Sequence, residues 1–128
     1  MAKAFRNVEP IAKATVTMSK VIPIASLRTE SGSSEFEGRF FGSDVCFILI
    51  DSEARSGPAL HKHPYSETYV VLEGTALFQI GDHEVRASGG SVVVVPPGVP
   101  HRFENVGPGR LLQIDIHGSD RFRTEWLD

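Results

Sequence analysis

The chain has 128 residues and a formal net charge of -3 at pH 7. This length predicts one domain, and its 41% hydrophobic and 23% charged residues are typical of a soluble globular protein. The negative net charge, without a cluster of basic residues, argues against binding to nucleic acid or to an anionic membrane. The longest apolar runs, VCFILI and SVVVV, are far shorter than the roughly 20 residues of a membrane-spanning helix.

Two features indicate the compartment. The opening MAKAFRNVEP lacks the apolar core of a signal peptide, and the single cysteine, Cys46, cannot form an internal disulfide. We therefore expect a cytoplasmic protein. Cys46 lies within an apolar run and is expected to be a small buried hydrophobic residue.

Residues 1–44 carry the weakest pattern. TVTM (15–18) and VIPIA (21–25) alternate weakly and could form short edge strands, whereas residues 29–38 are rich in Ser, Gly and Glu. We expect 29–38 to be a loop, or a lid. The whole N-terminal region is predicted to pack on the rest of the domain.

Residues 45–118 form a series of short segments with high β propensity, separated by turns that contain Gly, Pro or Asp. Their spacing of roughly eight to ten residues predicts an all-β sandwich or barrel. The expected strands are residues 45–51, 68–74, 75–81, 83–88, 91–96, 101–107 and 111–117. Residues 119–128 are predicted to form a short C-terminal helix, anchored by Trp126.

Two histidines, His61 and His63, stand two residues apart. On a strand they share a face, roughly 6.6 Å apart along the backbone, which lets both imidazoles approach one ion. Glu67 follows with the same parity, and Pro64 and Ser66 allow the bend that brings it back. Alone this pattern is a weak signal.

A third histidine follows a stiff turn. In Pro96-Pro97-Gly98-Val99 the third position suits the positive φ of a type II turn. Pro100 then holds the chain extended, so that His101 enters the next strand near its start. A side chain held in this way is well placed to be a ligand at the rim of a barrel.

These residues resemble the two motifs of the cupin superfamily, H-x-H-x(3,4)-E-x6-G and G-x5-P-x-G-x2-H-x3-N. HKHPYSETYVVLEG matches the first at His61, His63, Glu67 and Gly74, and GSVVVVPPGVPHRFEN matches the second at Gly90, Pro96, Gly98, His101 and Asn105. The glycine that opens the first motif is replaced by Arg55, with Gly57 two residues later. The fifteen residues between the motifs match the spacing of small single-domain members (monocupins of the cupin-2 type).

The resemblance implies a double-stranded β-helix, a jelly-roll barrel of two antiparallel sheets. It implies that His61, His63, Glu67 and His101 hold one divalent transition metal: Fe, Mn, Ni, Zn, Co or Cu. It also implies that Asn105 supports the fold and does not bind metal. Six-fold coordination would leave two positions for water or substrate.

The parity of the strands predicts the walls of the site. Tyr69 and Val71 share a face with Glu67, and Phe103 shares one with His101, so these three are expected to line a pocket, although Phe103 could simply fill the core. Arg39, Arg55 and Tyr65 flank the expected rim and could bind an anionic substrate, but surface charges near loops are common.

Residues 111–117 alternate between an aliphatic and a polar face. We expect the aliphatic side chains to point into the barrel and the polar ones outwards. The alternative is a polar inner face, with Gln113 near the metal. The aliphatic set is Leu112, Ile114 and Ile116, and the polar set is Gln113, Asp115 and His117.

The run from Val92 to Val95 is apolar on both faces, so its outer face needs a cover. A second subunit would make the protein a homodimer; the alternative cover is the N-terminal strands of the same chain. An intact ligand set favours an enzyme for a small molecule, with dioxygenase-like or Lewis-acid isomerase or lyase chemistry. The alternatives are a non-catalytic protein that binds or senses a small molecule, and a barrel that the metal only stabilises.

Overall fold

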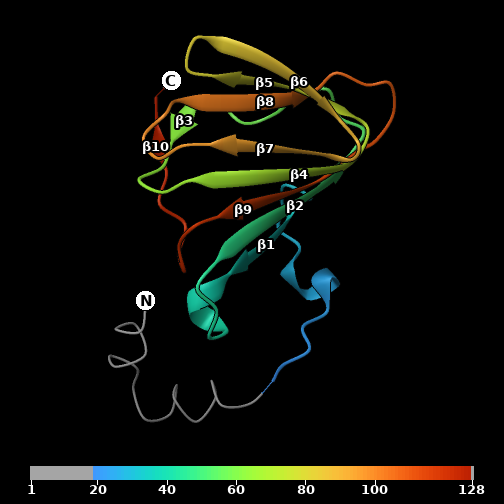
Figure 1. The fold of residues 1–128 in the computed structure, drawn as a ribbon. Helices are drawn as coiled ribbons and strands as arrows, with labels where there is room; N and C mark the ends of the chain where they lie inside the picture. Colours follow the sequence, from blue (N-terminus) through green and yellow to red (C-terminus); the bar gives the residue numbers. More distant parts are fainter. Residues whose placement is uncertain (1–18, 128) are drawn as a thin grey trace.

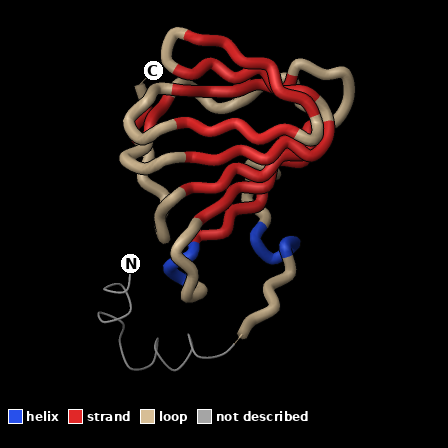
Figure 2. Tube along the Cα trace, viewed as in Figure 1, coloured by secondary structure: helices blue, strands red, loops and turns tan. Residues whose placement is uncertain are grey.

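A computed structural model describes residues 19–127, which form two five-stranded antiparallel sheets (Figures 1 and 2). In order across it, the first sheet contains β1 (Ser34–Glu37), β2 (Cys46–Ser52), β9 (Leu111–His117), β4 (Glu67–Glu73) and β7 (Ser91–Val95). The second contains β10 (Glu125–Trp126), β3 (His61–Lys62), β8 (His101–Asn105), β5 (Thr75–Ile80) and β6 (His83–Ser88). The predicted all-β class is confirmed.

Alternation along the strands places the core between the sheets. In β4, Glu67, Tyr69 and Val71 are buried while the residues between them are partly exposed, and β5 buries Ala76 and Phe78 in the same way. The apolar core consists of Tyr69, Val71, Ala76, Phe78, Ala87, Val93, Val95, Phe103 and Leu111. Cys46 is fully buried, as predicted, and burial raises the pKa of its thiol.

The N-terminal predictions need correction. Residues 24–27 form a 3-10 helix, η1 (Ile24–Leu27), and not an edge strand. Part of the expected loop 29–38 is strand β1, because its backbone pairs with β2 and Phe36 stacks on Phe47, with ring centroids 4.9 Å apart. A second 3-10 helix, η2 (Gly38–Phe40), follows. The possible strand TVTM lies outside the described residues, and the division at residue 44 stays a prediction.

The predicted C-terminal helix is wrong. Residues 119–124 are irregular, and β10 then pairs with β3, where Trp126 lies opposite His61. A helix of about nine residues is marginal by itself, and the free edge of β3 offers the backbone better partners. Trp126 is therefore 59% exposed instead of anchoring a helix, and its ring lies 5.0 Å from that of His61. Among residues 19–127, no helix has the length and apolar character needed to cross a membrane.

The preferred orientation of β9 is also wrong: its polar face points inwards, as in the alternative, but Gln113 does not line the cavity that contains His61, His63 and Glu67. Gln113, Asp115 and His117 are buried at 0–3% exposure, whereas Ile114 and Ile116 are only partly buried. The reason is the pairing with β4: residues directly opposite on neighbouring strands point to the same side. His117 lies opposite the inward-pointing Glu67, so the polar face of β9 must point inwards.

Candidate metal centre

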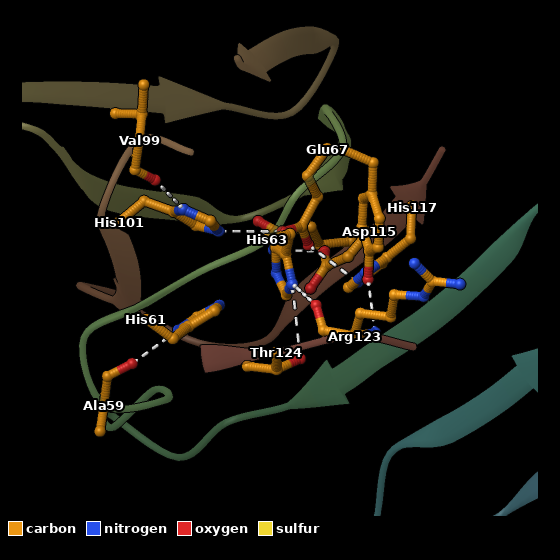
Figure 3. A network of polar contacts seen from close by, with 12 residues as sticks. Ala59, His61, His63, Glu67, Val99, His101, Asp115, His117, Arg123 and Thr124 are labelled. Atoms are coloured by element: carbon orange, nitrogen blue, oxygen red, sulfur yellow. Dashed lines mark hydrogen bonds and ion pairs between the residues drawn. The ribbon is translucent and has the colours of Figure 1, made fainter. Parts of the chain in front are cut away.

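The four predicted ligands meet inside one end of the barrel (Figure 3). His61 lies on β3, His63 directly after it, Glu67 at the start of β4 and His101 at the start of β8. All four are at most 5% exposed, and one donor atom from each lies within 4.8 Å of the others. The two histidine-bearing segments are brought together because His61 lies opposite His101 in the β3–β8 pairing.

The turn before β8 has the predicted form. Gly98 has φ +78°, and the Val99 N–H donates to the Pro96 carbonyl at 3.4 Å, as in a type II turn. The Gly98 N–H also donates to the His63 carbonyl at 2.8 Å. The turn thus sets the entry of His101 and fixes the segment that carries His63.

The three predicted histidine ligands share one tautomer. Each directs Nδ1 at a backbone carbonyl 2.7–2.8 Å away. A carbonyl oxygen can only accept, so each Nδ1 carries the hydrogen and each Nε2 keeps its lone pair for a metal. The carbonyls belong to Ala59 for His61, Arg123 for His63 and Val99 for His101.

These lone pairs face a carboxylate. Glu67 Oε1 lies 2.9 Å from His101 Nε2 and 3.0 Å from His63 Nε2, and His63 Nε2 is buried without a hydrogen-bond partner among the described residues. Two acceptors held this close in a buried site need a cation between them. In the metal-free protein this cation is a proton, as in the hydrogen bond between His101 Nε2 and Glu67 Oε1, and in the loaded site it would be the metal. Three imidazoles and one carboxylate suit a divalent transition metal, so the residues present fit the ion that the motifs imply.

The charges of the ligands agree with this fit. Burial lowers the pKa of His61, which favours the neutral imidazole that a metal requires. Burial alone would raise the pKa of Glu67, but its contacts with the imidazoles of His101, His117 and His63 outweigh burial and lower it. The carboxylate therefore stays ionised.

A cavity of about 720 Å³ leads to the ligands. Of the predicted wall residues, Tyr69 and Phe103 line it, whereas Val71 lies deeper, in the apolar core. Arg39 and Arg55 do not line the cavity; Arg28, which the sequence did not suggest, does. The other side chains around it include Ile48, Ile50, Phe122, Thr124 and Trp126.

Sequence reasoning assigned two inward-pointing residues of the site, Asp115 and His117, to the outer face of β9. Asp115 lines the cavity and accepts a hydrogen bond from Gln113 Nε2 at 2.8 Å; burial and the nearby Glu67 raise the pKa of its carboxyl well above the ordinary value. His117 Nε2 lies 3.1 Å from Glu67 Oε2. Only the pairing of β9 with β4 could have indicated either residue.

Comparisons with known proteins agree with this geometry. The model of the cupin domain matches residues 48–117, more than half of the chain, and the chain belongs to the cupin family. Uncharacterized protein MJ1618 of Methanocaldococcus jannaschii is 39% identical over 49 residues, 38% of this chain and 39% of that protein. Uncharacterized protein SCO3923 of Streptomyces coelicolor is 39% identical over 44 residues, 34% of this chain and 42% of that protein. The matched region thus spans about two fifths of each relative's length.

Among solved structures, the chain is similar to oxalate decarboxylase from Bacillus subtilis, with a TM-score of 0.67 and 22% identity over 75% of this chain and 27% of that one. It is also similar to a formate complex of the Lactobacillus farciminis oxalate decarboxylase, with a TM-score of 0.68 and 17% identity over 78% and 32%. At this identity the likeness shows the cupin fold.

Proposed function

We propose that this cupin is a metal-dependent enzyme that acts on a small molecule. The observation that supports the proposal is the cavity, which leads directly to His61, His63 and Glu67. A metal that served only to stabilise the barrel would not need an open approach. Four protein ligands would leave two positions of an octahedral ion for exogenous molecules.

A metal bound here would supply either open positions for substrate and dioxygen or a Lewis acid for isomerase or lyase chemistry. Other residues of the chain would contact the substrate. Tyr69 and Phe103 line the cavity with aromatic rings whose centroids lie 5.8 Å apart, which gives the substrate an apolar wall. Burial and the nearby Glu67 raise the pKa of Asp115, and a protonated Asp115 would donate a hydrogen bond to an oxygen atom bound in the cavity. Decarboxylation, the reaction of the oxalate decarboxylases to which the fold is similar, belongs among the lyase reactions to be tested.

The experiment begins with the metal content of the purified protein, followed by reloading with Fe(II), Mn(II), Co(II), Ni(II), Cu(II) or Zn(II). Each form is then tested with oxalate and a panel of small hydroxy, keto and phenolic acids. Oxygen uptake with substrate supports a dioxygenase, and CO2 release or isomerisation without oxygen uptake supports Lewis-acid chemistry. Saturable binding of a compound without turnover would favour a binding or sensing protein and contradict the proposal.

We also propose that the protein is a homodimer that covers the outer face of β7. Val92 and Val94 are 62% and 57% exposed on this edge strand, and both point away from the core. Sedimentation velocity should show a dimer for the wild type and a monomer for Val92→Lys/Val94→Lys. A wild-type monomer at the same concentrations would contradict the proposal.

We further propose that the protein is cytoplasmic. This location is supported by the buried, unpaired Cys46, which suits a reducing compartment. Cell fractionation of the native host with an antibody against the chain tests it, and recovery in an extracytoplasmic fraction would contradict it.

A further inference from the structure

The described part of the site contains a fourth imidazole, and its surroundings differ from those of the other three. His117 is buried at 2% exposure, and its ring centroid lies 4.7 Å from that of His63. Its Nδ1 lies 2.7 Å from the hydroxyl of Tyr65. A hydroxyl can donate or accept, so the tautomer of His117 depends on where the hydrogen of Tyr65 points.

The hydrogen bonds around Tyr65 decide this question. The Arg123 N–H donates to the Tyr65 oxygen at 3.1 Å, which leaves the hydroxyl hydrogen free to donate to His117 Nδ1. The hydrogen of the ring then lies on His117 Nε2.

The hydrogen on His117 Nε2 has one acceptor within reach. Glu67 Oε2 lies 3.1 Å away, and Nε2 has no other polar partner among the described residues, although it is not aligned with Oε2 as an ideal hydrogen bond would be. The other oxygen of the same carboxylate, Oε1, faces the lone pairs of His63 and His101. The two oxygens of Glu67 thus meet two kinds of imidazole nitrogen.

One backbone residue accounts for both kinds. The Arg123 carbonyl accepts from His63 Nδ1 at 2.8 Å, while its N–H donates to Tyr65 at 3.1 Å. Within a helix these backbone groups would bond to other residues of the helix, so the irregular course of residues 119–124 leaves them available to the site.

We propose that His117 is a positioning residue, not a metal ligand: its Nε2–H holds Glu67 Oε2, so that Glu67 binds the metal through Oε1 alone. Tyr65 and the Arg123 peptide fix the tautomer that this role requires. The inference rests on the proposed metal site and is independent of whether the protein is catalytic.

Long-range 1H–15N NMR of the Zn(II)-loaded protein, labelled at histidine, tests the tautomers directly. We expect Nδ1–H for His61, His63 and His101, each with a metal-shifted Nε2, and Nε2–H without metal contact for His117. A metal-bound Nε2 or an Nδ1–H at His117 would overturn the inference. A wild-type protein that binds no stoichiometric metal would overturn the metal site as well.

Metal affinity, measured with Co(II) and Zn(II) against a competing chelator, tests the positioning role. Loss of a partner that orients a ligand weakens binding by about 10- to 100-fold, which we expect for His117→Leu. His117→Gln, whose amide can still donate to Oε2, should recover most of the affinity. His83→Leu, which removes an exposed imidazole, is the matched control and should bind as the wild type does.

Tyr65→Phe keeps the test informative if His117→Leu does not fold. It removes only the hydroxyl, and we expect weaker metal binding together with a changed Co(II) absorption spectrum. The double variant Tyr65→Phe/His117→Leu should bind no more weakly than His117→Leu, since both act through one chain of contacts. Unchanged affinity and spectrum in both single variants would overturn the inference.

Discussion

Metal binding should stabilise the fold as well as complete the site. The metal-free protein buries the ionised Glu67 carboxylate at 2% exposure beside the Nε2 atoms of His63 and His101, an arrangement that only the folded chain presents. A divalent ion satisfies these atoms and cannot find them assembled in the unfolded chain. We therefore expect the addition of Zn(II) or Co(II) to raise the unfolding temperature, and His101→Ala to remove this effect.

The magnitude follows from linkage. At a free metal concentration about 100 times the Kd, binding stabilises the folded state by about 2.7 kcal/mol. For a chain of 128 residues, an unfolding entropy of about 2.1 cal/mol/K per residue gives about 0.27 kcal/mol/K, so the midpoint should rise by about 10 °C. Each further tenfold increase in metal should add about 1.4 kcal/mol.

Differential scanning fluorimetry of chelator-treated protein over a metal titration measures this shift. His83→Ala is the control, because the His83 side chain is 83% exposed and is not one of the four predicted ligands. An equal shift in His101→Ala and the wild type would mean that the stabilising ion binds elsewhere. No shift in a wild type shown to bind the metal would refute the argument that the metal binds the folded chain and not the unfolded one.

Three further predictions concern single side chains. Since the pKa of Asp115 is raised in the fold, the folded metal-free protein keeps a proton that the unfolded chain loses above about pH 4. The contribution of Asp115 to the free energy of unfolding therefore falls as the pH rises, by up to about 1.4 kcal/mol per pH unit. Urea unfolding at several pH values should show that Asp115→Asn removes this pH dependence. An equal pH dependence in the variant and the wild type would contradict the prediction. Phe103→Ala should cost about 3–5 kcal/mol in urea unfolding, because Phe103 packs on Tyr69 and Phe78 with centroids 5.8 Å away; a loss below about 1 kcal/mol would make Phe103 a cavity wall only. Gly98→Ala should lower the free energy of unfolding by about 1–2 kcal/mol through backbone strain alone, since an added Cβ meets no atom within 4 Å. An unchanged midpoint of thermal unfolding would mean that the turn relaxes.

The ligand end of the barrel was predictable because its signals are local. The turn that delivers His101 depends on the φ of Gly98 and on two prolines, all within a few residues. His61 and His63 are two residues apart, and this spacing alone predicts that they share one face of a strand. Even the shifted glycine has a structural reason, since the Phe103 backbone carbonyl oxygen approaches Gly57 too closely for any Cβ.

The inner face of β9 was not predictable in the same way. Hydrophobic patterning assumes that aliphatic side chains face the core, but the side of a strand is decided by its pairing partner. Here β4 must turn Glu67 inwards, and the Glu67–His117 pairing then turns His117 and Asp115 inwards with it. The C-terminal helix was wrong for a similar reason, because its apparent period spans only nine residues and the edge of β3 lies far away in the sequence.

The inward-pointing polar face of β9 has an energetic consequence. The interior of the barrel is divided along β9, with Leu111 in the apolar core at one end and His117 beside Glu67 at the other. Between them lie Gln113, whose Oε1 has no partner among the described residues, and Asp115, whose pKa is raised by burial and by the nearby Glu67. Burying these groups costs free energy that a one-residue slip would avoid, since it would bury Ile114 and Ile116 instead. The apolar half of the interior must offset this cost, and under the proposed function a bound metal would add to it.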